Sequence, residues 1–235
     1  MFRAMTQATD FTRLAAINAR ISDALMAAGR PVDACQLIVV SKTQSAERLL
    51  PLVQDHRIEL GENYLSEALP KIAALPQGQI WHYIGAIQSN KTAPIAEHFD
   101  WVHTVDREKI ARRLSDQRPE HRAPLNVLIQ VNLDGEASKA GCEPNQVAAL
   151  AEQISQLPRL NLRGLMSIPA PNQTDPAAPH RALAQLLAPL NEKYPQCDCL
   201  SMGMSGDMEA AIVSGATHVR VGTAIFGPRA PKDTA

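Results

Sequence analysis

A lysine that directly follows a run of apolar residues is the side chain around which the chemistry of this sequence is organised. Residues 37–40 are apolar, three of them are β-branched, and Ser41 and Lys42 follow at once. Such a run predicts a strand buried on both faces. In parallel α/β folds the ligand lies at the carboxyl ends of the strands, where a desolvated lysine can lose its proton and condense with a carbonyl. From this stretch alone, a solvated lysine just past a strand is the alternative.

Two stretches near the C-terminus contain the glycines and hydroxyls of an anion site. Residues 203–207 include Ser205, and residues 222–227 begin with Gly222 and Thr223. In (β/α)8 barrels the loops after strands seven and eight often bind phosphate. Gly222 lets the backbone approach an anion, and the two hydroxyls add donors. A plain turn glycine is the alternative for Gly222, and Ser205 is also expected to cap the next helix.

Four further side chains are expected near these stretches. Arg220 lies two residues before the second phosphate stretch, on the same face of its strand, and an arginine inside a barrel needs a partner. His82 lies among apolar residues, and a core histidine bonded to the backbone is the alternative for it. Asn63 after strand two and Met166 at the end of strand six complete the ring of candidates.

An imine-forming lysine, a phosphate cradle and an arginine between them suit a phosphorylated aldehyde cofactor, pyridoxal 5′-phosphate (PLP). Two other ligand classes remain open at this point. A sugar-phosphate aldolase would also use lysine and phosphate, but with the lysine on a later strand and a carboxylate beside it. A phosphate-binding isomerase would want a glutamate base at a strand end.

Eight apolar stretches alternate with helical patterns and predict the elements that position these residues. Strands are expected at residues 37–40, 58–60, 81–84, 101–104, 126–132, 162–166, 199–202 and 218–221. This order is typical of a (β/α)8 TIM barrel. An open doubly wound sheet is the alternative, although no G-x-G-x-x-G follows the first strand.

Helix signals surround these strands. An extra helix over residues 10–29 precedes the first strand, with Asp10 as its N-cap. Ser45 and Asp106 are expected to cap two later helices. The proline-rich residues 169–179 read as an extended loop between a strand and a helix.

Composition limits the function classes. The 235 residues fit one domain, residues 1–235, and 45% are apolar. With 23 basic and 24 acidic residues the net charge is −1, so no nucleic-acid partner is expected. No apolar run approaches ~18 residues and no signal peptide is seen, so we expect no membrane contact and a cytoplasmic location. The four cysteines form no C-x-x-C pair, which predicts buried thiols and no metal site.

The sequence resembles the pyridoxal phosphate homeostasis proteins, whose fold is like the N-terminal barrel of alanine racemase. The resemblance runs in order over nearly the whole chain, and its segments are residues 40–43, 61–64, 82–85, 88–91, 130–132, 138–142, 163–166, 201–212 and 219–227. Two departures, Ser66 and Leu183, lie outside the expected site.

The resemblance implies a role for each candidate residue. Lys42 would carry PLP as a Schiff base, and Arg220 would face the pyridine nitrogen. The phosphate would be held by Ser205, Gly222 and Thr223, and the ring would be lined by Asn63, His82 and Met166. The family is thought to buffer or deliver PLP, with effects on amino-acid and keto-acid balance and no established reaction. Apo PLP-dependent enzymes are the implied recipients, and we expect a monomer.

A PLP-dependent amino-acid racemase with low activity is the alternative function. A racemase of this fold takes its second base, a tyrosine, from an additional C-terminal β-domain. The sequence stops at Ala235, eight residues after Gly227, so we expect that domain to be absent. Tyr64 and His82 are the nearest candidates for another base. A guanidinium at the ring nitrogen would also weaken the electron sink that transaminases and decarboxylases need.

Overall fold

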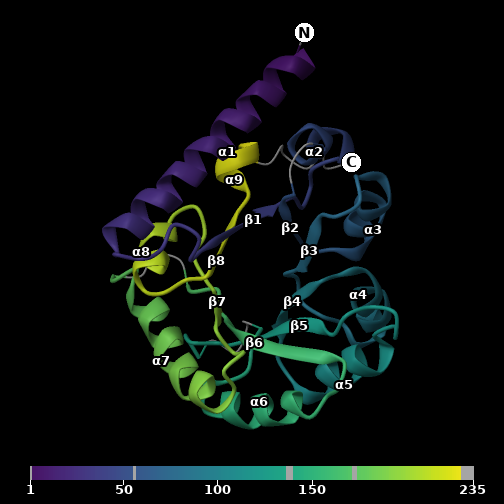
Figure 1. Ribbon diagram of the computed structural model, residues 1–235, viewed down its shortest axis with the longest axis vertical. Helices are drawn as coiled ribbons and strands as arrows, with labels where there is room; N and C mark the ends of the chain where they lie inside the picture. The colour runs from purple at the N-terminus through teal and green to yellow at the C-terminus, as the bar shows by residue number, and fades with distance from the viewer. Residues whose placement is uncertain (1, 55–56, 136–139, 171–173, 229–235) are drawn as a thin grey trace.

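The protein forms a closed barrel of parallel strands (Figure 1). The computed structural model describes residues 2–54, 57–135, 140–170 and 174–228. Within these ranges the strands follow the barrel in sequence order: β1 Gln36–Val40, β2 Glu59–Glu62, β3 Ile80–Tyr83, β4 Trp101–Val105, β5 Leu125–Gln130, β6 Leu160–Met166, β7 Cys199–Ser201 and β8 His218–Val221. The predicted TIM barrel is confirmed, and the open-sheet alternative is wrong because β1 pairs with both β2 and β8.

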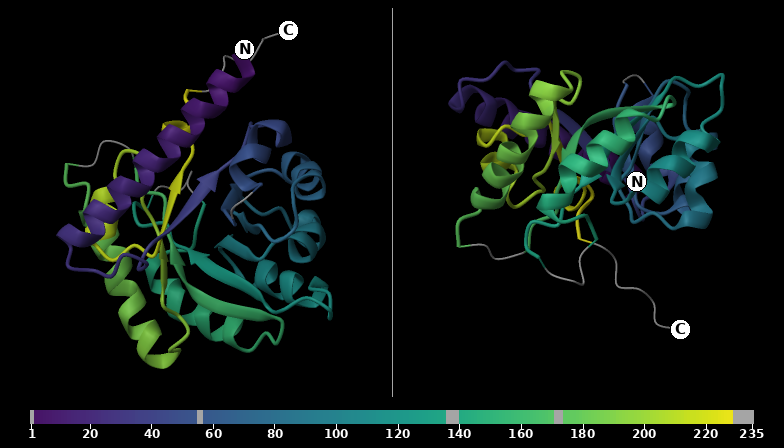
Figure 2. Two further views of the ribbon diagram at one scale, coloured as in Figure 1. Left: turned by 45° about the horizontal axis from the view of Figure 1, so that its top comes forward. Right: turned by 90° about the horizontal axis from the view of Figure 1, so that it is seen from below.

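Helices surround the barrel on its outside (Figure 1). Their bounds in the described residues are α1 Phe2–Ala27, α2 Ala46–Val53, α3 Leu65–Ala74, η1 Ser89–Lys91, α4 Thr92–His98, α5 Glu108–Gln117, η2 Pro144–Gln146, α6 Val147–Ser155, α7 Ala178–Lys193, α8 Met208–Val213 and α9 Thr223–Phe226. The predicted extra N-terminal helix is α1. It lies across α8 and α9, as Figure 2 shows. The described part of the proline-rich loop connects β6 to α7, and residues 171–173 lie outside the described residues.

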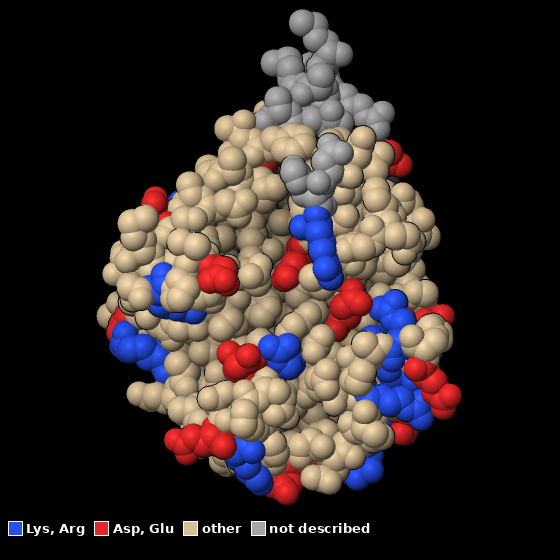
Figure 3. All heavy atoms as spheres, in the orientation of Figure 1, with Lys and Arg blue, Asp and Glu red and all other residues tan. Residues whose placement is uncertain are grey.

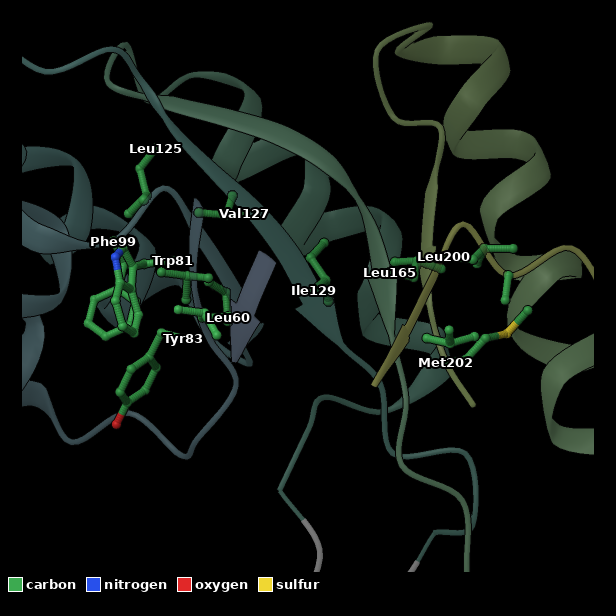
Figure 4. Packing of buried hydrophobic residues seen from close by; sticks show 14 of the residues in the cluster. Leu60, Trp81, Tyr83, Phe99, Leu125, Val127, Ile129, Leu165, Leu200 and Met202 are labelled. Carbon is green, nitrogen blue, oxygen red and sulfur yellow. The ribbon is translucent and has the colours of Figure 1, made fainter. Parts of the chain in front are cut away.

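Alternation along the strands separates an apolar outer face from an interior that contains both polar and apolar side chains. The outward residues pack against the helices, and Figure 4 shows Leu60, Trp81 and Tyr83 on one side of this layer and Leu165, Leu200 and Met202 on the other. Each such buried side chain contributes about 1.5–3 kcal/mol. The inward residues are unusual for a barrel core, because the buried inward side chains include His82, His103, Ser201, His218 and Arg220.

One of the predicted helix caps is confirmed. The Ser45 hydroxyl accepts a hydrogen bond from the Arg48 amide at 3.4 Å. The Asp10 prediction is wrong because α1 begins at Phe2, so Asp10 lies inside the helix and its carboxylate binds Arg48 instead.

The other two caps are also wrong. Arg107 is the N-cap of α5, and the Asp106 carboxylate receives its guanidinium at 2.7 Å. Asp207, not Ser205, is the N-cap of α8, because the chain makes one further turn before the helix begins.

The cysteines match their predicted character. All four are buried and none forms a disulfide. Burial raises the pKa of the Cys197 and Cys199 thiols to about 12. Across the ranges described above, no helix combines the length and the apolar character needed to cross a membrane, and no group of three or more His, Cys, Asp or Glu side chains is placed to hold a metal ion. On the face seen in Figure 3, acidic and basic side chains are interspersed.

Candidate functional site

A pocket of about 220 Å³ opens at the carboxyl ends of β1, β2 and β8. Six of the eight predicted site residues line it: Lys42, Asn63, Ser205, Arg220, Gly222 and Thr223. Its other described lining residues, which were not among the predicted ones, are Val40, Thr43, Gln44, Ile84, Ile168, Met204, Phe226 and Gly227. Ile84 and Ile168 could have been found from the sequence, because they lie just after strands that carry the predicted residues His82 and Met166.

A buried ion pair fixes the backbone next to Lys42. Lys71 Nζ lies 2.6 Å from Glu62 Oε1 and donates to the Ser41 carbonyl at 2.8 Å. The Ser41 hydroxyl donates to the same carboxylate oxygen at 2.6 Å. Burial raises the pKa of Glu62 above its ordinary value, although the bonds from Lys71 and Ser41 act to lower it. These contacts hold the residue before Lys42 from both sides, so the chain leaves β1 in a fixed direction.

Thr43 adds backbone strain at the same turn. Its φ of 68° lies in the left-handed region, which a β-branched residue rarely adopts. The Thr43 amide donates to Glu67 Oε2 at 2.6 Å, which holds the turn in place. Strain of this kind costs about 1–3 kcal/mol and is found mainly at functional sites.

The predicted phosphate end is formed by two loops that come together at the pocket. Ser205 is half-buried and Thr223 is exposed, so both hydroxyls are accessible from solvent. A Cβ at Gly222 would lie only 2.9 Å from the Val40 carbonyl oxygen. Packing against β1 therefore requires glycine here, whether or not an anion also uses the space.

Neighbouring elements hold the Ser205 loop. Asp207 accepts a hydrogen bond from the Met204 amide at 2.6 Å and lies 3.1 Å from His180 Nε2. Burial acts to raise the pKa of Asp207, but the bonds from His180 and the Met204 amide bring it below its ordinary value. From the other side, Arg20 of α1 donates to the Ser205 carbonyl at 3.3 Å.

Arg220 places a buried positive charge at the base of the pocket. Its side chain donates to Ser201 Oγ at 2.7 Å and to the Ser167 carbonyl at 2.9 Å. Burial lowers the pKa of the guanidinium to about 10, so it remains charged at neutral pH. Arg220 therefore has the partners that a buried arginine was expected to need, and both are neutral oxygens.

Asn63 brings an unsatisfied group to the pocket. Its Oδ1 is buried and has no hydrogen-bond partner among the described residues. A buried polar atom without a partner costs free energy that a bound ligand can recover. The residues at this site therefore fit a small ligand with hydrogen-bonding groups.

The structure places the other two predicted site residues in the barrel interior instead of the pocket lining. His82 Nδ1 lies 2.9 Å from His103 Nε2, so its partner is a side chain and not the backbone. Met166 is fully buried and packs with Leu128 and Cys199. A contact of either with a ligand remains a prediction.

Comparison with known proteins identifies the family. The sequence matches the family described as alanine racemase, N-terminal domain, over residues 12–230. A pyridoxal phosphate homeostasis protein of Vibrio cholerae is 55% identical over 220 residues, which span 91% of this chain and 93% of the relative. This chain belongs to the pyridoxal phosphate homeostasis proteins. The predicted resemblance is confirmed.

Solved structures agree with this assignment. PipY of Synechococcus elongatus, solved without PLP, has a TM-score of 0.80 and 36% identity, with 92% of this chain and 99% of that chain covered. The same protein with PLP bound has a TM-score of 0.75 and 35% identity, with 88% and 100% covered. Alanine racemase of Corynebacterium glutamicum shares the fold, at a TM-score of 0.64 and 17% identity, with 92% and 62% covered.

Proposed function

We propose that this chain binds PLP at the mouth of its barrel and carries it within the cell as a homeostasis protein, without catalysing a reaction. The observation that carries the proposal is the convergence in one pocket of an amine, a buried guanidinium and two hydroxyls, from Lys42, Arg220, Ser205 and Thr223. The PLP-bound structure of PipY supports the same ligand.

Each part of the pocket suits one part of the cofactor. PLP supplies an aldehyde that an amine can attack, and Lys42 is the amine in the described lining. Ser205 and Thr223 donate hydrogen bonds to the phosphate beside Gly222. Asn63 recovers a partner for its buried oxygen at the ring, and His82 and Met166 support the ring from within the barrel.

Arg220 favours storage over catalysis. A guanidinium has only donors and stays protonated in proteins, so it offers the ring nitrogen a hydrogen bond and leaves that nitrogen unprotonated. The electron-withdrawing power of the ring is then weak, which disfavours the chemistry of transaminases and decarboxylases.

The lining of the pocket also favours a carrier over a racemase. Among its described residues, Lys42 and Arg220 are the only ionisable side chains. Racemisation needs an acid–base group on each face of the α-carbon, and each contributes roughly 10²–10⁴-fold. Tyr64 is 58% exposed and lies outside the lining, and His82 is fully buried in the barrel.

Incubation of the PLP-loaded protein with L-amino acids in deuterated water separates the two functions. A carrier should introduce no deuterium at the α-carbon above trace rates, and should pass PLP to an apo PLP-dependent enzyme. Exchange at ordinary enzyme rates that disappears in Lys42→Ala would support the racemase instead. In this proposal the carrier acts as a cytoplasmic monomer, which sedimentation of the loaded protein tests.

A further inference from the structure

A line of polar side chains crosses the barrel interior from Arg220 to Glu59. Arg220 Nη1 lies 2.7 Å from Ser201 Oγ, which lies 2.8 Å from His103 Nδ1. On its other side, His103 Nε2 lies 2.9 Å from His82 Nδ1. His82 Nε2 then lies 3.3 Å from Glu59 Oε2. Five strands contribute one residue each, so the closed barrel itself assembles the line.

The line is closed to solvent except at its two ends. Ser201, His82 and His103 are fully buried. Arg220 ends in the pocket at the mouth, and Glu59 lines a second pocket between α1 and the opposite end of the barrel. His82 Nε2 and Glu59 Oε2 are buried and form no hydrogen bond in the described part of the chain, and the 3.3 Å between them is an ion-pair distance.

The chemistry of Arg220 sets the direction of the hydrogen bonds from one end. A guanidinium can only donate, so Ser201 Oγ accepts from it. The described residues give that oxygen two partners, Arg220 and His103. The serine hydrogen is therefore directed to His103 Nδ1, which acts as an acceptor. A neutral His103 then carries its proton on Nε2 and donates to His82 Nδ1.

Glu59 imposes the same direction from the other end. Burial acts to raise the pKa of its carboxyl, but the contact with His82 and the nearby charge of Arg57 bring it below its ordinary value. An ionised carboxylate only accepts, so the His82 nitrogen 3.3 Å from it carries a proton. Because His82 Nδ1 accepts from His103, the direction of the hydrogen bonds is the same from both ends.

We propose that Ser201, His103 and His82 form a one-directional chain of hydrogen bonds that positions Arg220, with Glu59 at ion-pair distance from its far end. The three are positioning residues, because they act on the ligand through Arg220. The part of this proposal that concerns PLP rests on the proposed function.

The arrangement has a clear physical use. A carboxylate in direct contact with Arg220 would hold the guanidinium but neutralise much of its field at the ring. Ser201 instead holds it through a neutral oxygen. The carboxylate of Asp207 acts on the guanidinium by its charge, and the carboxylate of Glu59 lies at the far end of the line. Charged hydrogen bonds fix the orientation of a guanidinium strongly, so the ring nitrogen of a ligand meets a donor that is already in place.

The tautomers of the two histidines test the chain in protein free of PLP. In protein with ¹⁵N-labelled histidine at neutral pH, both rings should show the chemical shifts of neutral Nε2–H imidazole. Assignment uses His82→Gln and His103→Gln. A neutral Nδ1–H form at either ring, or a His82 imidazolium that donates to His103, would overturn the proposal. The tautomers are read from the folded wild-type protein, and the two variants serve only to assign its signals.

A binding experiment tests the consequence for the ligand. Ser201→Ala interrupts the chain of hydrogen bonds. It should weaken the binding of PLP and of unphosphorylated pyridoxal by the same factor, about fivefold to tenfold, because the change acts at the ring. Ser201→Thr keeps the hydroxyl and should restore most of the affinity. His218→Gln is the matched control: His218 is buried in the same interior but lies outside the line, its Nδ1 being 2.9 Å from Thr217 Oγ1.

The outcomes separate the two proposals. Unchanged affinities in Ser201→Ala, or an equal loss in His218→Gln, would contradict the positioning role while leaving PLP binding intact. Failure of the wild-type protein to bind PLP would instead contradict the proposed function, and the histidine tautomers would still decide whether the chain exists.

Discussion

At the scale of residues, the proposed function divides the pocket into an end for phosphate and an end for the ring. Ser205 lies in the loop after β7 and Thr223 begins α9 just after β8, while Arg220 lies at the base. Lys42 enters from β1. Each end makes its own contribution to affinity, so variants at one end should be distinguishable from variants at the other.

The phosphate end gives the first prediction. The double variant Ser205→Ala/Thr223→Ala should weaken the binding of PLP far more than the binding of unphosphorylated pyridoxal, because only PLP carries the phosphate that these hydroxyls are proposed to bind. Hydrogen bonds to charged groups contribute about 1.5–3 kcal/mol each, so the loss for PLP should exceed about tenfold. Fluorescence titration with both ligands measures it, and an equal loss for both would show that the phosphate binds elsewhere.

The residue types at this site could be predicted only where position in a strand made them conspicuous. Lys42 follows a fully apolar run and Arg220 interrupts one, so both stood out in the sequence. His103 and Ser201 carry the same signal of a polar residue within a buried strand, in β4 and β7, and that signal could have found them. The left-handed backbone of Thr43 could not be predicted, because no sequence pattern indicates a positive φ at a threonine.

At the scale of elements, α1 ties the barrel to the loops of the site. Asp10 of α1 is 1% exposed and forms a two-pronged ion pair with Arg48 of α2, at 2.7 and 2.8 Å. Arg48 also donates to the Phe226 carbonyl of α9 at 2.9 Å and lies over the Phe226 ring. One guanidinium therefore joins three helices around the phosphate end.

Removal of this charge should loosen the assembly. Asp10→Asn keeps the shape of the side chain but loses the ion pair, and should lower the free energy of unfolding by about 1.5–3 kcal/mol. Urea unfolding measures this change. Glu108→Gln provides the control, because its pair with Arg112 is exposed and should contribute no more than about 0.5 kcal/mol. Similar small losses in both would mean that the Asp10 pair has no structural role.

The order of elements was predictable, whereas several of their ends were not. Short apolar runs rich in β-branched residues, such as residues 37–40 and 127–129, indicate buried strands. The start of α1 was placed at Asp10 because that residue is a good cap in isolation. Its true partner, Arg48, is 38 positions away in the sequence, and only the closed barrel brings the two together.

At the scale of the whole molecule, the barrel interior contains two histidines whose pKa values are lowered. His103 and His218 are buried. Burial, together with the positive charges nearby, lowers the pKa of His103 well below its ordinary value and lowers that of His218 to about 4. The groups that face His218 are His82, Glu59, Arg163 and Asp198.

Stability should therefore fall as the pH drops from about 6.5 towards 4. Above about 6.5 these histidines are neutral in both states and contribute no pH dependence. Below about pH 6.5 these histidines are protonated in the unfolded chain but not in the folded protein. Each histidine therefore lowers the free energy of unfolding by up to ~1.4 kcal/mol per pH unit. The loss from His218 ends near pH 4, where the folded form also protonates.

Urea unfolding at several pH values between about 7.5 and 4.5 measures this slope. His218→Gln should flatten it by up to one proton, whereas His98→Gln should leave it nearly unchanged, because the His98 side chain is 38% exposed. A slope that is the same in all three proteins would contradict the assignment of His218 as a buried neutral group.

Reduction of the PLP-loaded protein with borohydride, followed by peptide mapping, tests the central claim most directly. We expect the pyridoxyl mass on the peptide that contains Lys42, and we expect no such label in Lys42→Arg. Folding of that variant is checked by its urea midpoint. A label on Lys91, Lys139 or any other lysine, with Lys42 unmodified, would contradict the account.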